Sequence, residues 1–199
     1  MFSCYQYCLQ KQVPNNRIFI VGDSAGGNLA ISTTFHILEN IPDKLPAATL
    51  SLSGWLDLTQ EYTGHSPNSG TDWLTMMDEA NTKTNVIDRY CGPLIKSRAD
   101  PRVSPLRRPS LKGLPPQFVS AGQAEVLYMD SKLWADRCLE ELGPENTEIH
   151  FPEREVHTFQ IGGWLTSTQM REESDGRILS FLEKHTPKRD WEPPHYAGL

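Results

Sequence analysis

Residues 18–21 are four consecutive apolar residues, Ile-Phe-Ile-Val, with no polar residue between them. Turn-forming residues 14–16 precede this run, and Gly22 follows it. A short, bounded run of β-branched and aromatic residues is typical of a β-strand. A strand without alternation is buried on both faces, as in the middle of a parallel sheet. We therefore predict a buried parallel strand over residues 17–21.

The remainder of the chain alternates between strand-like and helix-like segments. Further strands are predicted over 47–52, 117–121 and 147–151, and helices over 26–40, 72–89, 130–142 and 175–184. Between them, residues 100–116 contain five prolines and are predicted to form an extended loop. Strands that alternate with helices indicate an α/β fold, in which crossover helices connect the strands of a mostly parallel sheet.

Length and charge restrict the classes of function. The chain has 199 residues, enough for one ordinary domain. Its 19 basic and 25 acidic residues give a net charge of −6, which repels phosphate backbones and argues against nucleic-acid binding. The sequence offers no apolar stretch suited to a membrane span. The first 12 residues lack the basic segment and apolar run of a signal peptide, so we expect a cytoplasmic protein.

The four cysteines do not indicate a metal site. They are Cys4, Cys8, Cys91 and Cys138, and none belongs to a Cys-x-x-Cys pair. Nothing near them in the sequence completes the usual four-ligand set of a zinc centre. We therefore expect free, partly buried thiols and no bound metal.

A glycine-rich segment, GDSAGG, occupies residues 22–27, between the first predicted strand and the first predicted helix. A sharp strand-to-helix turn of this kind needs small residues beside a serine, because the backbone there is strained and crowded. Such a turn lifts the Ser24 hydroxyl above the carboxyl edge of the sheet. The start of the following helix also favours negative charge at that point. The alternative is a glycine-rich turn without chemistry, and the position of the motif favours a nucleophile.

Several motifs in order along the chain resemble the hormone-sensitive-lipase-like branch of the α/β-hydrolase superfamily, the group called alpha/beta hydrolase fold-3. They occupy residues 22–30 (GDSAGGNLA), 53–59 (SGWLDLT), 100–106 (DPRVSPL), 114–116 (LPP), 122–127 (GQAEVL) and 157–159 (HTF). Together they are far more specific than the serine motif alone. The resemblance implies an α/β-hydrolase fold, of which this chain covers only the carboxyl-terminal half.

The resemblance implies that the acid of a catalytic triad comes from the loop after the strand at 117–121. Glu125 stands where the family motif has an acid, usually Asp. A glutamate is tolerable if the loop retreats to absorb one extra methylene. Asp130 is the rival, although its position at the start of the next predicted helix is explained by an N-cap role. A solvated loop acid is the alternative without chemistry for Glu125.

His157 is the candidate base. It follows the strand at 147–151 by a short loop, whereas the other histidines lie in helical, strand, turn or tail segments. It also matches the His-x-Phe motif of the family. The resulting order Ser24, Glu125, His157 is the order in which α/β-hydrolases carry their triad. A surface histidine without a function is the alternative.

By the same resemblance, the chain is expected to be a carboxylic-ester hydrolase that works through an acyl-enzyme. The N–H group of Ala25, next to the nucleophile, supplies part of the oxyanion hole. Small or medium acyl esters are the expected substrates, and neither a metal nor an organic cofactor is required. Residues 1–185 form a partial hydrolase domain, with 60–95 as a cap or pocket wall, and residues 186–199 form a tail.

One family motif is absent. The resemblance leads us to expect a His-Gly-Gly-Gly stretch upstream of the serine, whose backbone N–H groups complete the oxyanion hole, and the 199 residues contain none. We therefore expect a truncated chain with impaired activity. Its first strand is expected to lie at a sheet edge and to invite aggregation, including homodimer formation. A catalytically inactive remnant and a small-molecule-binding relative stay open as alternatives to an esterase.

Overall fold

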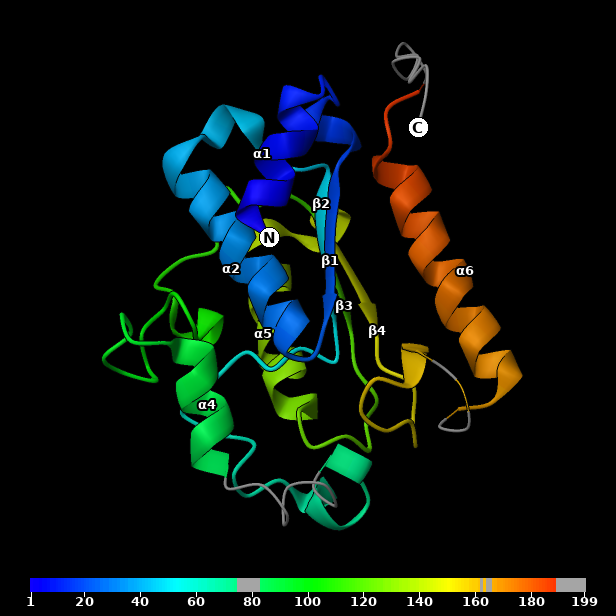
Figure 1. The fold of residues 1–199 in the computed structure, drawn as a ribbon. Helices are drawn as coiled ribbons and strands as arrows, with labels where there is room; N and C mark the ends of the chain where they lie inside the picture. Colours follow the sequence, from blue (N-terminus) through cyan, green and yellow to red (C-terminus); the bar gives the residue numbers. More distant parts are fainter. Residues whose placement is uncertain (75–82, 162, 164–165, 189–199) are drawn as a thin grey trace.

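The structure is a computed structural model that describes residues 1–74, 83–161, 163 and 166–188. Its centre is a sheet of four parallel strands in the order β1-β2-β3-β4 (Figure 1). These strands are β1 (Phe19–Asp23), β2 (Ala48–Leu52), β3 (Gln117–Ser120) and β4 (Thr147–His150). All four expected strands are present, shifted by up to two residues, and the predicted α/β fold with a parallel sheet is confirmed.

Helices cover both faces of this sheet (Figure 1). The α-helices are α1 (Phe2–Gln10), α2 (Ala25–Asn40), α4 (Lys83–Cys91), α5 (Tyr128–Leu142) and α6 (Thr168–His185). On one face α1, α2 and α5 pack together, and on the other face α6 packs alone. The chain therefore forms three layers, and the carboxyl ends of the strands all open at the same edge of the sheet.

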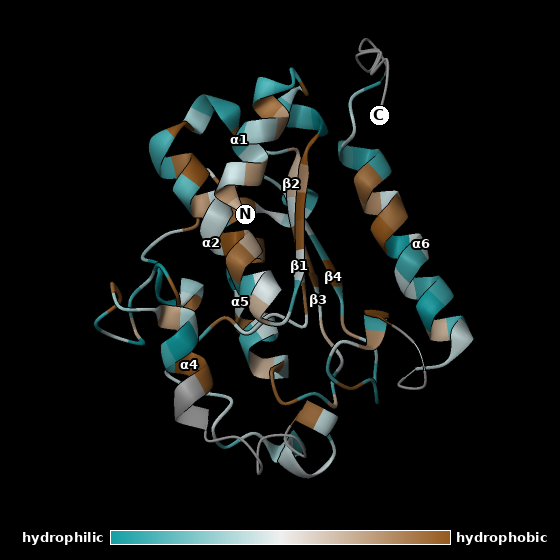
Figure 2. Ribbon diagram, viewed as in Figure 1, coloured by the Kyte–Doolittle hydropathy of each residue, from teal (hydrophilic) through white to brown (hydrophobic). Residues whose placement is uncertain are grey.

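The core is divided by the sheet into two parts. On one side Ile31 of α2 and Trp134 of α5 pack against Val119 of β3. On the other side Leu50 and Phe118 pack against Phe181 of α6. Neighbouring residues of β3 thus face opposite layers, as the period of a strand requires. Figure 2 shows hydrophobic residues along the strands and on the helices beside them.

The first strand differs from the expectation of burial on both faces. It begins at Phe19, two residues later than predicted, because Arg17 belongs to a short 3-10 turn. Within the described residues β1 is an edge strand, and Val21 is 45% exposed. On this face Phe19 packs against the cluster that α6 forms with β2 and β3, whereas Val21 is not part of that cluster. The expectation of an edge strand holds, whereas self-association through this edge stays a prediction.

Two helices begin earlier than predicted. The helix expected from 130 or 131 begins at Tyr128, so Asp130 lies inside its first turn and does not cap it. The helix expected from 175 begins at Thr168, because the Ser167 hydroxyl accepts a hydrogen bond from the N–H of Met170 and so caps it. This Ser cap is a signal that the sequence carries. Of the helix expected over 72–89, residues 75–82 lie outside the described residues, as do residues 189–199 of the expected tail.

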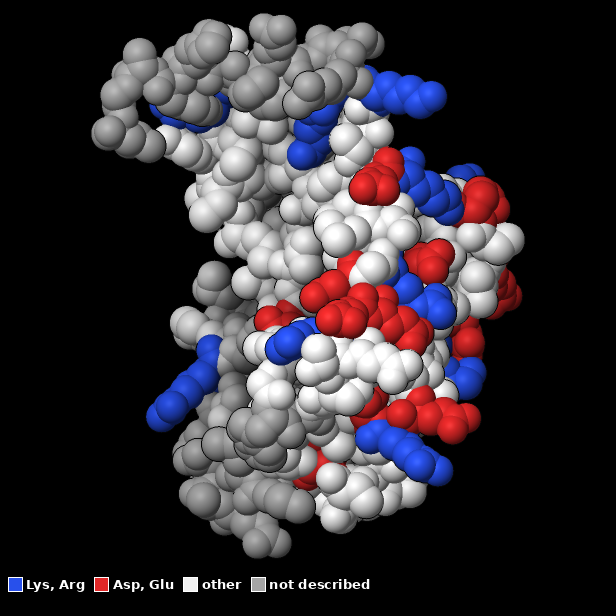
Figure 3. Space-filling view, turned by 90° about the vertical axis from the view of Figure 1, so that its right-hand side faces the viewer, with Lys and Arg blue, Asp and Glu red and all other residues white. Residues whose placement is uncertain are grey.

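The surface gives little indication of function. On the face formed by α6, acidic and basic side chains are interspersed (Figure 3). No helix among the described residues is long and apolar enough to cross a membrane. The four cysteines are free thiols, as predicted.

Candidate active site

Ser24 stands between β1 and α2 in a backbone conformation that non-glycine residues rarely adopt. Its φ is 54° and its ψ is −121°. Backbone strain of this kind costs about 1–3 kcal/mol and persists where the surrounding structure enforces it. Here the N–H of Ser24 donates to the carbonyl of Leu52, and its own carbonyl accepts from Gly27 and Trp55. The predicted sharp turn is therefore present, and contacts on both sides hold it.

Close packing of backbone against backbone explains why glycine occupies two positions of this turn. A Cβ atom at Gly22 would lie 2.1 Å from the carbonyl oxygen of Gly26. At Gly27 it would lie 2.8 Å from Ser51 Oγ and 3.1 Å from Gly54 Cα. At Gly26 the nearest atom would be 3.8 Å away, an ordinary contact. Lack of space therefore requires glycine at positions 22 and 27. It does not require glycine at position 26, the second glycine of the Gly-x-Ser-x-Gly motif.

His157 and Glu125 lie next to Ser24 in space, although 133 residues separate Ser24 from His157. His157 Nε2 is 3.0 Å from Ser24 Oγ. On the other side of the ring, His157 Nδ1 is 3.4 Å from Glu125 Oε2. Both loops that carry these residues follow the carboxyl ends of neighbouring strands, β3 and β4. The structure therefore brings the three predicted site residues together.

Burial dominates the electrostatics of the pair. The His157 ring and the Glu125 carboxyl are almost fully buried. Loss of water raises the pKa of Glu125, and the neighbouring His157 opposes this by favouring the charged carboxylate. The nearby carboxylate of Asp72 raises the pKa of Glu125 further. His157, when its ring is positively charged, is therefore the main group that favours the ionised form of Glu125.

The rival acid, Asp130, has other partners. Its Oδ2 atom accepts hydrogen bonds of 2.9 Å from the backbone N–H groups of Leu56 and Asp57. It is fully buried, and this burial raises its pKa to about 7. These hydrogen bonds connect α5 to the loop after β2. They argue against both an N-cap role and a catalytic role for Asp130. Glu125 is the acid that faces the histidine.

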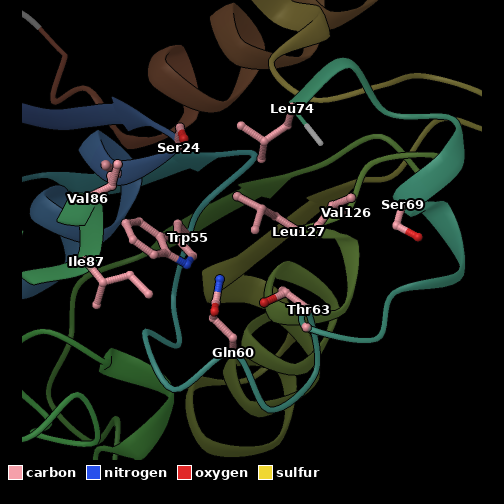
Figure 4. A pocket seen from close by; sticks show the side chains of 12 residues that line it. Ser24, Trp55, Gln60, Thr63, Ser69, Leu74, Val86, Ile87, Val126 and Leu127 are labelled. Atoms are coloured by element: carbon pink, nitrogen blue, oxygen red, sulfur yellow. The ribbon is translucent and has the colours of Figure 1, made fainter. Parts of the chain in front are cut away.

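A cavity of about 210 Å³ opens beside Ser24 (Figure 4). The side chains of Trp55, Leu74 and Leu127 form apolar walls, and Gln60 and Thr63 supply polar groups. The 12 described residues that line it also include Ser24, Ala25, Gly64, Ser69, Val86, Ile87 and Val126, and none of these 12 carries a charge. Seven of the 12 lie within residues 60–95, the segment expected to act as a cap or pocket wall.

Ala25 is the first residue of α2 and lines the same cavity. The first N–H groups of a helix have no acceptor within the helix and point toward its amino-terminal end. The N–H of Ala25 is thus available at the mouth of the cavity, next to Ser24, where the sequence predicts an oxyanion donor.

Three further residues contact the two loops and were not found from the sequence. The indole N–H of Trp73 donates to the carbonyl of His157 at 2.7 Å, and the two rings lie 5.6 Å apart. Asp72 accepts from the backbone N–H groups of Val126 and His157. Asn68 donates to the carbonyl of Glu125 at 2.9 Å. Asp72 is the first residue of the helix predicted over 72–89, and no local pattern in the sequence distinguishes it.

No group of three or more His, Cys, Asp and Glu side chains within the described part of the chain is arranged to hold a metal ion.

Comparison with known proteins identifies relatives for most of the chain. A family model described as "alpha/beta hydrolase fold" matches residues 1–161. A protein named acetyl-hydrolase from Streptomyces hygroscopicus is 31% identical over 165 residues, which cover 81% of this chain and 50% of the relative. A protein named esterase from Acinetobacter venetianus is 32% identical over 153 residues, covering 76% of this chain and 46% of the relative. The chain thus spans about half the length of these curated relatives.

Solved structures agree with the sequence relatives. A crystal structure titled hormone-sensitive lipase from a metagenome library matches with a TM-score of 0.77 at 27% sequence identity. The match covers 92% of this chain and 60% of that one. The esterase E40 variant S202W/I203F matches with a TM-score of 0.74 at 24% identity, over 94% of this chain and 59% of that one.

Proposed function

The chain belongs to the alpha/beta hydrolase fold family, and on that basis we propose that it acts as a serine carboxylic-ester hydrolase. The observation that carries the proposal is the 3.0 Å contact between His157 Nε2 and Ser24 Oγ on a strained strand-to-helix turn. A nucleophile and a base at this separation are what acyl transfer needs. The names of the two sequence relatives, acetyl-hydrolase and esterase, support the same reaction class.

In the proposed reaction His157 Nε2 accepts the proton of Ser24 as Oγ attacks the ester carbonyl carbon. The C–O bond to the alcohol then breaks, and the alcohol oxygen takes the proton from Nε2. The acyl group stays on Ser24 until His157 deprotonates a water molecule that attacks the same carbon. Release of the acid returns the proton to Ser24 Oγ, so the chain ends as it began.

Glu125 is proposed to hold the Nδ1 proton of His157 and to stabilise the ring while it is positively charged. Its separation of 3.4 Å from Nδ1 is longer than an ideal hydrogen bond. Catalytic contacts of this kind are often long without substrate and shorten in the complex. The Ala25 N–H is proposed to donate to the carbonyl oxygen as negative charge develops on it.

The cavity beside Ser24 supports small or medium acyl esters as substrates. Its volume of about 210 Å³ is below the ~300–1,000 Å³ typical of small-molecule sites, and the described residues of its lining are uncharged. An apolar acyl chain gains from burial there, whereas a charged acyl chain would lose its water without a partner. We assign residues 60–95 the role of a pocket wall, since they contribute Thr63, Leu74 and Ile87.

The 199 residues contain no His-Gly-Gly-Gly stretch, the motif expected to complete the oxyanion hole. Each oxyanion donor typically contributes about 10²- to 10³-fold to turnover. We therefore propose that this chain by itself hydrolyses esters slowly. The same absence favours a second candidate, an inactive relative that only binds a small molecule in the cavity.

Hydrolysis of p-nitrophenyl butyrate by the chain and by its Ser24→Ala variant tests the proposal. We expect slow turnover that Ser24→Ala lowers to the rate of buffer alone, because no other group replaces Oγ. Equal hydrolysis by the two proteins would overturn the assignment of Ser24. Saturable binding of the ester without turnover by either protein would instead establish the second candidate.

A further inference from the structure

Residues 68–73, a turn-rich segment before α4, contact both loops of the proposed triad. From this segment Asn68 Nδ2 donates to the carbonyls of Gln123 and Glu125, each at 2.9 Å. Trp73 Nε1 donates to the carbonyl of His157 at 2.7 Å. Side-chain hydrogen bonds thus join this segment to the backbone carbonyls of Gln123, Glu125 and His157.

Asp72 is the residue of this segment whose carboxylate reaches both loops. Its Oδ2 accepts from the N–H of Val126 at 2.7 Å, directly after Glu125. Its Oδ1 accepts from the N–H of His157 at 3.3 Å and from the N–H of Leu74 at 3.3 Å. Asp72 is fully buried, and hydrogen bonds to a charged acceptor contribute more than neutral ones.

We propose that Asp72 is a positioning residue that fixes the distance between Glu125 and His157 by binding one backbone N–H of each loop. The inference rests on the proposed function, because it assigns Asp72 a role in the same reaction. The two loops follow different strands and are joined directly by backbone hydrogen bonds of 3.0 Å, from Gln123 to Pro152 and from Ala124 to Glu155. Asp72 adds a link beyond these, next to the two side chains that have to meet. A bridging carboxylate satisfies a donor from each loop at once, so that neither loop moves without breaking a bond.

The Asp72→Asn variant keeps the size of the side chain and disturbs only its hydrogen bonds. It leaves one backbone donor facing an amide N–H₂, because an asparagine side chain has only one acceptor oxygen. The two loops are then held less firmly, and the loosened geometry should lower kcat.

Asp130→Asn is the matched control. Asp130 is also a fully buried aspartate whose carboxylate accepts two backbone N–H groups, those of Leu56 and Asp57, and it lies outside the triad. A general loss of stability should therefore affect both variants. A change confined to Asp72→Asn belongs to the proposed role.

The test combines kinetics on p-nitrophenyl butyrate with amide hydrogen exchange of the full chain. For Asp72→Asn we expect kcat to fall about 10- to 100-fold with KM within about threefold, because a small misplacement of catalytic groups has effects of this size. The amides of Val126 and His157 should exchange at least about tenfold faster, while those of Leu50 and Val119 in the sheet stay unchanged.

Unchanged kcat or equal effects in Asp130→Asn would overturn the inference. If the unmodified chain shows no hydrolysis, the proposed function fails, and hydrogen exchange then decides separately whether Asp72 holds the two loops. Should Asp72→Asn not fold, Asp72→Glu keeps the carboxylate but displaces it by one methylene. It is expected to speed exchange of the amides of Val126 and His157. Wild-type exchange at both amides would overturn the inference.

Discussion

The nucleophile and its two partner loops share close backbone packing but differ in their side-chain contacts. At Ser24 the strand and the helix approach so closely that Gly22 leaves no space for a Cβ atom. The two loops approach each other as closely, since a Cβ at Gly122 would lie 2.1 Å from the carbonyl oxygen of Glu155. Side chains of residues 68–73 add hydrogen bonds to the backbone of both loops. Changes at the close backbone contacts should therefore affect folding first, and changes at these side chains or at the acid should affect turnover first.

Gly22→Ala should have the largest effect, because the new Cβ would lie 2.1 Å from the carbonyl oxygen of Gly26. The strand or the start of α2 must then move, and we expect a loss of more than about 3 kcal/mol in the free energy of unfolding. Urea denaturation followed by circular dichroism measures this loss. Gly26→Ala is the control: its Cβ meets nothing closer than 3.8 Å, so stability should stay within about 1 kcal/mol. Equal losses in the two variants would contradict the difference in packing.

Glu125→Gln should affect turnover more than folding, since the side chain keeps its size. The amide can no longer stabilise a positive His157, so we expect kcat on p-nitrophenyl butyrate to fall about 10²- to 10⁴-fold. Glu153→Gln, at an exposed position in the turn that leads to His157, should leave kcat unchanged. A Glu125→Gln variant with the wild-type kcat would show that His157 works without this acid.

Asp130 is a buried aspartate outside the proposed triad, and it should make the free energy of unfolding depend on pH. Its pKa is raised by burial from 3.8 to about 7, so the folded chain holds this proton more tightly than the unfolded chain does. Its contribution therefore favours folding at acid pH and is lost as the pH rises toward 7. Between pH 5 and pH 8 the wild type should lose about 2 kcal/mol more than Asp130→Asn does. Parallel stability curves from urea titrations would refute this expectation.

Local patterns were sufficient to predict most of the fold. The predicted strands are short segments that contain apolar or β-branched residues, and the preference of such residues for an extended backbone is local. Burial is not local: β1 was expected to be buried on both faces, yet Val21 is 45% exposed. Helix starts were less predictable. The cap of α6 at Ser167 is visible in the sequence, but Asp130 also looked like a cap and instead binds the loop at Leu56 and Asp57.

The sequence by itself determined the turn at Ser24, because the demand for small residues beside it is local. The order of serine, acid and histidine was implied by the family resemblance. Only the tertiary structure decided that Glu125 and not Asp130 faces His157. It also revealed Asp72, whose partners Val126 and His157 lie 54 and 85 positions away in the chain. A hydrogen bond over such a separation depends on how the strands order the loops in space, and no local pattern encodes that distance.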